Sequence, residues 1–138
     1  MHHPESRRTM SIRTQHLQVS ALKSRVRDYP LLSAEQVVAR LKGRATMGAE
    51  ALCQQLAEGG FLLEIAWGGE LRYPAFMVAE GEVFEEMPTL LERLGQELEA
   101  DVEHYLWLTE QHPELEAVPA DLLTSREGRL ILLAFLQD

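Results

Sequence analysis

The sequence predicts a mainly α-helical protein with one β-hairpin near its middle. Gly68-Gly69 separates two runs of strand-forming residues, 61–67 and 71–77, and glycine readily adopts the positive φ angles of a two-residue hairpin turn. Two short amphipathic helical patterns precede the hairpin, and leucine-rich helical patterns follow it to the end of the chain. We therefore expect an N-terminal part that carries the hairpin and a small C-terminal helical domain.

Residues 1–30 are expected to form a polar tail and a basic helix. Between residues 10 and 28, Ile12, Val19 and Val26 recur every seven positions and form an apolar stripe, while basic residues occupy other positions. Such a stripe can pair with a second copy of the chain or pack on its own domain. A Tyr-Pro pair then ends the helix.

Residues 31–78 have the pattern of a helix-turn-helix module. Ser33 and Gln36 have capping-box spacing, which predicts a helix to about Lys42. A second helical pattern covers 47–58 and stops at a Gly-Gly pair. Helix, tight turn, helix and hairpin is the order of a winged helix-turn-helix, in which the second helix enters the major groove of DNA.

Pro74 limits the place of the second hairpin strand. Proline has no amide hydrogen and cannot donate to a ladder from the middle of a sheet. The second strand should therefore lie at an edge of the sheet or bend at Pro74.

Residues 79–138 are expected to form the C-terminal helical domain. Apolar periodicity predicts helices from Pro88 to about Glu99 and around Tyr105, and Pro119 is placed to begin a short helix. The last run, 128–136, is almost wholly apolar. It should be deeply buried or form an interface.

The charges divide the chain. Residues 1–44 hold nine Lys and Arg against three acids, a net charge of +6, whereas the remainder has a net charge of −15. The basic end could approach nucleic acid, or the two ends could attract each other within one chain or across a dimer. The side chains that could contact DNA are Arg40, Lys42, Arg44, Gln54, Gln55 and Arg72. Glu50 and Glu58 on the second helix would repel phosphate, so a module retained only for packing is an equal alternative.

Other classes of protein find little support. No apolar run reaches the length of a membrane span and no secretory signal is evident, so we expect a cytoplasmic protein. The single Cys53 cannot form an internal disulfide, and no metal-ligand spacing is present. His104 and His112 lie beside acids but lack a nucleophile or a phosphate-binding loop, so neither an enzyme nor a cofactor is expected.

Two segments resemble the Xre/MbcA/ParS type of bacterial antitoxin. Trp107-Leu108, Leu115, the string Pro119-Ala120-Asp121-Leu122-Leu123, and Gly128 with its apolar helix resemble the toxin-binding domain of that family. Arg-Tyr-Pro-Ala-Phe at 72–76 resembles the form with an excisionase-like helix-turn-helix in front.

The resemblance implies a protein that neutralises a toxin, typically an NAD-consuming or ADP-ribosylating RES-type enzyme, by covering its active site. Members of the family often also repress their own operon, so operator DNA and a homodimer or hetero-complex are expected. Arg126 and Arg129 are expected to pair with acidic groups of the toxin or to occupy an anionic subsite. The expected toxin-binding residues are Trp107, Asp121, Leu122, Leu123, Arg126, Gly128, Arg129 and Phe135.

Overall fold

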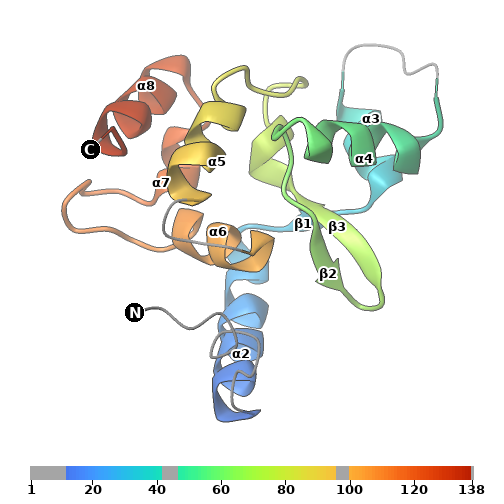
Figure 1. The fold of residues 1–138 in the computed structure, drawn as a ribbon, viewed down its shortest axis with the longest axis horizontal. Coiled ribbons are helices and arrows are strands. Elements are labelled where there is room, and N and C mark those ends of the chain that lie inside the picture. Colours follow the sequence, from blue (N-terminus) through green and yellow to red (C-terminus); the bar gives the residue numbers. More distant parts are fainter. Residues whose placement is uncertain (1–11, 42–46, 96–99, 138) are drawn as a thin grey trace, which may run out of the picture.

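A computed structural model of the chain describes residues 12–41, 47–95 and 100–137 (Figure 1). Its helices are α2 (Ile12–Asp28), α3 (Ala34–Arg40), α4 (Ala49–Glu58), α5 (Met87–Gly95), α6 (Asp101–Leu108), α7 (Pro119–Leu122) and α8 (Arg126–Phe135), with a 3-10 helix η1 (Ala75–Val78). Its strands are β1 (Leu31–Leu32), β2 (Ile65–Trp67) and β3 (Glu70–Pro74). The prediction of a mainly helical protein with one hairpin is confirmed.

The hairpin lies where the glycine pair predicts it. Gly68 and Gly69 have φ angles of 63° and 84° and join β2 to β3, which pair antiparallel. Both angles are positive, as a two-residue turn that matches the strand twist requires. β1 pairs with the other side of β3, so the sheet has the order β1-β3-β2. The second hairpin strand is therefore central, and the edge position expected for it is wrong.

Pro74 instead ends the strand, which is the second of the two expected outcomes. It lies opposite Leu31 at the last pair of the ladder, and the chain then turns into η1. Residues 75–77 are therefore helical and not extended. The next amide, that of Ala75, donates to the Pro30 carbonyl at 2.9 Å. Backbone hydrogen bonding therefore continues directly after Pro74, although Pro74 itself has no amide hydrogen to donate.

The two short helices before the hairpin pack on each other. The predicted capping box is confirmed, because the Ser33 amide donates to the Gln36 side chain at 2.8 Å and the Gln36 amide donates to Ser33 Oγ at 3.2 Å. α3 ends at Arg40, and Lys42 lies outside the described residues. Between α3 and α4, Val37 and Cys53 are fully buried.

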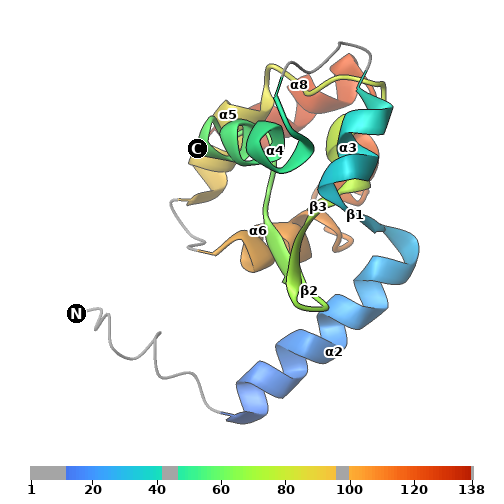
Figure 2. The same ribbon diagram turned by 90° about the vertical axis from the view of Figure 1, so that its right-hand side faces the viewer.

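The last turns of α2 anchor this helix to the rest of the chain. Leu22 is buried and Val26 packs on the core of the same chain, so these two positions serve internal packing. Arg25 donates to the Leu106 carbonyl and to Thr109 Oγ1, both at 3.0 Å. In both ribbon views the N-terminal half of α2 extends away from the other elements (Figures 1 and 2).

The C-terminal helices share one hydrophobic core with the hairpin and the last turns of α2. Pro119 begins α7, as predicted, and the Ser125 side chain accepts from the Gly128 amide at 3.0 Å to cap α8. Leu132 of α8 is fully buried in this core. None of the described helices combines the length and the apolar character that crossing a membrane requires.

Candidate protein-binding site

The outer face of α8 exposes apolar side chains to solvent. Leu130 is 50% exposed and Ile131 is 48% exposed. Arg126, Glu127 and Ala134 are also exposed and lie on the same side of the helix, because residues three and four apart are neighbours on a helix surface. We use the term α8 outer face for these five residues. Adjacent half-exposed Leu and Ile side chains form the kind of patch that proteins bury in an interface.

The opposite side of α8 is packing surface. A Cβ atom added at Gly128 would lie 2.0 Å from the Leu122 carbonyl oxygen and 2.7 Å from its carbonyl carbon. Gly128 is therefore the point of closest approach between α7 and α8. Leu123 is fully buried in the core. Both residues were expected to contact a toxin, and the structure instead uses them to hold the helix that displays the outer face.

Arg129 is bound within the chain. Its Nε donates to Glu86 Oε1 at 2.8 Å, and its Nη1 donates to the Leu123 carbonyl at 2.9 Å. The guanidinium carbon lies 4.2 Å from the centre of the Phe84 ring, and the residue is only 8% exposed. The expectation that both arginines are available to a partner is thus corrected, since only Arg126 is exposed.

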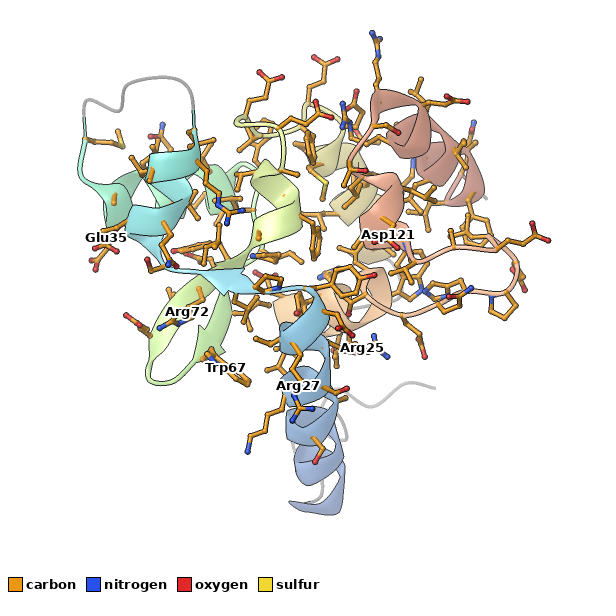
Figure 3. The ribbon with its side chains drawn as sticks, turned by 180° about the vertical axis from the view of Figure 1, so that it is seen from behind. Arg25, Arg27, Glu35, Trp67, Arg72 and Asp121 are labelled. Atoms are coloured by element: carbon orange, nitrogen blue, oxygen red, sulfur yellow. The ribbon has the colours of Figure 1, made fainter. Side chains whose placement is uncertain are left out.

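The remaining expected toxin-binding residues lie around the α6–α7 region and the end of α8. Trp107 and Phe135 are half-buried, as is Leu122. The Trp107 ring lies 4.3 Å from the His112 ring, centre to centre. Asp121 is exposed and accepts a hydrogen bond from the Tyr29 hydroxyl at 3.1 Å, which ties α7 to the end of α2 (Figure 3).

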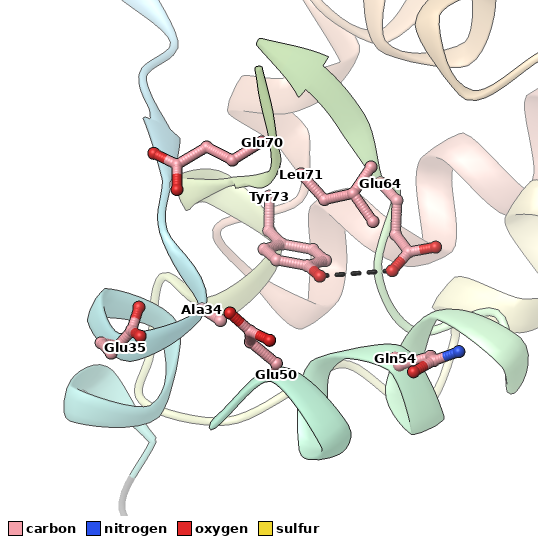
Figure 4. Close-up of a pocket in the computed structure, with 8 residues that line it drawn as sticks. All are labelled: Ala34, Glu35, Glu50, Gln54, Glu64, Glu70, Leu71 and Tyr73. Atoms are coloured by element: carbon pink, nitrogen blue, oxygen red, sulfur yellow. Dashed lines mark hydrogen bonds between the residues drawn. The ribbon is translucent and has the colours of Figure 1, made fainter. Parts of the chain in front are cut away.

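A second feature is a hollow of about 330 Å³ between α3, α4 and the hairpin (Figure 4). Four carboxylates line it, those of Glu35, Glu50, Glu64 and Glu70, together with Leu71 and Tyr73. The Tyr73 hydroxyl donates to Glu64 Oε2 at 3.2 Å, and burial, aided by the Glu64 charge, raises the pKa of Tyr73. We call this hollow the acidic groove.

The acidic groove adjoins several of the residues that were expected to contact DNA. Arg40, Gln54 and Gln55 are exposed, but Gln54 lines the groove among the glutamates. Arg72 is paired with Glu70 at 2.6 Å (Figure 3). Lys42 and Arg44, the other candidates, lie outside the described residues. Phosphates that approached this surface would meet the carboxylates of Glu35, Glu50 and Glu64, which have no paired cation among the described residues.

Other candidate chemistry is weak. Within the described ranges, no group of three or more His, Cys, Asp or Glu side chains is placed to hold a metal ion. Cys53 is fully buried, and burial raises the pKa of its thiol to about 11, far from the range of a reactive thiolate. Burial between α3 and α4 fits a packing role for Cys53.

His104 is a buried base with no hydrogen-bond partner among the described residues. The side chain is 7% exposed. Burial lowers its pKa below 6.5, and the nearby Asp101 and Glu103 charges and the Ala100 backbone only partly oppose this effect. His104 therefore folds in its neutral form.

Acidification is expected to destabilise the protein through His104. A histidine with a lowered pKa in the folded state binds its proton more readily when unfolded, so stability is full above pH 6.5 and falls as the pH drops below it. The loss is bounded by about 1.4 kcal/mol per pH unit for one proton. The midpoint of urea unfolding should decrease less between pH 7.5 and 5.5 in H104L than in the parent chain. Equal decreases would show that His104 is not the responsible group.

Several positions of the two candidate surfaces do not follow from the sequence pattern. Leu130 and Ile131 belong to the apolar run at 128–136, but no pattern within that run was used to separate its exposed side from its buried side. The sequence signal is the polar pair Arg126 and Glu127, because residues 130, 131 and 134 lie on their side of the helix. The four glutamates of the acidic groove come from separate segments, and only the fold brings them together.

Comparison of the chain with protein-family models, curated proteins and solved structures found no match. Function must therefore be inferred from the α8 outer face, from the acidic groove and from the sequence resemblance.

Proposed function

We propose that this chain is an antitoxin-like protein that binds a partner toxin enzyme through the α8 outer face and neutralises it. The observation that carries the proposal is the pair of adjacent half-exposed residues Leu130 and Ile131 on a helix whose other side is buried at Gly128, Arg129 and Leu132. The sequence resemblance supplies the class of partner, an NAD-consuming RES-type enzyme in the cytoplasm.

The energetics of the α8 outer face suit an interface. Full burial of a Leu or Ile side chain stabilises by about 1.5–3 kcal/mol, so the exposed half of each offers roughly 1 kcal/mol on binding. Arg126 stands at the start of the same face and can form a charge-assisted hydrogen bond to a partner carboxylate. An apolar centre with an arginine beside it has the composition of a binding hot spot.

A DNA-binding regulator, or an adaptor on the same fold without a toxin partner, is the alternative function. The order β1, α3, α4, β2, β3 supports a winged helix-turn-helix arrangement. The acidic groove between α4 and the hairpin opposes phosphate binding there. We infer that residues 31–78 serve mainly for packing and for contact with another protein. Under this alternative, the chain binds operator DNA only when a partner protein is bound to it.

The variant L130E/I131E is expected to lose partner binding. It removes the apolar contact and places two carboxylates in the interface, so the Kd should rise at least about 100-fold. The measurement is co-purification and calorimetric titration with the product of the neighbouring gene.

The matched control is M47E/L71E, because Met47 and Leu71 are 43% and 50% exposed but lie away from α8. This control should bind like the parent chain. If L130E/I131E binds as tightly as the parent chain, the α8 outer face is not the binding site. If the parent chain itself does not bind, the product of the neighbouring gene is not the partner.

A further inference from the structure

We propose that the acidic groove receives helix α2 of a second copy of the chain, and that two copies associate by exchanging these helices reciprocally. This inference is independent of the proposed function, because it uses a different surface and needs no other protein.

The acidic groove has the chemistry of a site for a basic helix. Of its four carboxylates, that of Glu70 is paired with Arg72, and those of Glu35, Glu50 and Glu64 have no ion pair with a Lys or Arg among the described residues. Leu71, half-exposed, and the Tyr73 ring provide apolar surface between them. Lys and Arg side chains lay their aliphatic stems on apolar surface while their charged ends reach polar groups. A groove lined by both carboxylates and apolar side chains can contact the charged ends and the aliphatic stems of Lys and Arg at the same time.

Helix α2 carries the complementary charge. It holds four basic residues and one acid over 17 residues, a net charge of +3. Lys23 and Arg27 are both exposed and four residues apart, so they lie on one face of the helix about 6 Å apart along its axis. Figure 3 shows Arg27 on the open side of α2, whereas Arg25 is used in bonds to Leu106 and Thr109.

Helix α2, which we call the arm, must come from another copy. Among its described side chains, those of residues 20–28, none lines the groove of its own chain. The bonds of Arg25 to α6 and of Tyr29 to Asp121 hold the end of α2 on the C-terminal helices, and its N-terminal half extends away from them (Figure 2). Each copy therefore presents two exposed basic residues of α2, Lys23 and Arg27, and one acidic groove. A two-fold axis satisfies both pairs at once and closes the assembly as a dimer.

The test is a charge swap between two full-length variants, followed by sedimentation velocity. The arm variant is K23E/R27E, and the groove variant is E35K/E50K, whose two glutamates make no side-chain ion pair among the described residues. At low salt we expect the parent chain to dimerise and each variant alone to associate at least about tenfold more weakly. An equimolar mixture should dimerise again, because each arm then meets a groove of opposite charge.

High salt should dissociate the parent dimer, since screening weakens these charge pairs. The control E80K/E92K changes the same number of exposed glutamates outside the groove and should dimerise like the parent. A parent chain that is monomeric at low salt would overturn the inference. So would a dimer that survives K23E/R27E or E35K/E50K, or a mixture that stays monomeric.

Discussion

Replacing Arg129 with methionine is expected to lower the free energy of unfolding by about 3–5 kcal/mol, because removing one member of a buried ion pair leaves the other charge uncompensated. The Arg129 and Glu86 side chains are each only 10% exposed. Loss of the guanidinium would also leave the Leu123 carbonyl without the donor it now has at 2.9 Å. Urea unfolding followed by circular dichroism measures the change.

Two further variants separate the ion pair from general effects on α8. R126M makes the same substitution three residues earlier, at an exposed position, and should change stability by less than about 0.5 kcal/mol. The double variant R129M/E86M removes both charges and should recover much of the loss. If R129M proved as stable as R126M, Arg129 would not be buried against Glu86 as described.

Gly128→Ala is expected to destabilise the protein by about 3 kcal/mol, which lowers Tm by roughly 10 °C in a chain of this size. Alanine is normally the better helix former by about 1 kcal/mol. Here its methyl group would lie 2.0 Å from a backbone oxygen of Leu122, which cannot move without separating α7 from α8. Differential scanning calorimetry gives the shift.

Gly95→Ala is the matched control, because Gly95 is also helical and a Cβ there meets nothing within 4 Å. This variant should be as stable as the parent chain or slightly more stable. A Gly128→Ala protein that melts with the Gly95→Ala protein would contradict the close approach of α7 and α8.

The features predicted correctly from the sequence are those that nearby residues determine. The capping box at Ser33 and Gln36 spans three positions, and the hairpin turn needs only two adjacent glycines. Pro119 at the first position of α7 is equally local. In each case the residue types allow one backbone conformation far more readily than others.

The features that were missed depend on residues far apart in the chain. Arg129 finds Glu86 43 positions away, and nothing in the sequence around either residue distinguishes an internal ion pair from a free arginine. The central place of β3 follows from its pairing with the two-residue strand β1, which is too short to show a periodic pattern. The acidic groove likewise exists only once the fold brings its four glutamates together.

The two proposed surfaces use different physical forces. The α8 outer face offers apolar contact with one arginine, whereas the acidic groove and α2 offer charge attraction. Binding through the first should therefore change little with salt, and self-association through the second should weaken as salt rises. Salt dependence alone distinguishes them.

The measurement that tests the proposed function most directly is the catalytic rate of the partner enzyme, followed as NAD consumption while the chain is added. Under the proposal, the parent chain and M47E/L71E suppress the rate as they reach equimolar concentration, and L130E/I131E leaves it nearly unchanged. Equal suppression by L130E/I131E, or an unaltered rate with the parent chain bound, would contradict neutralisation through the α8 outer face.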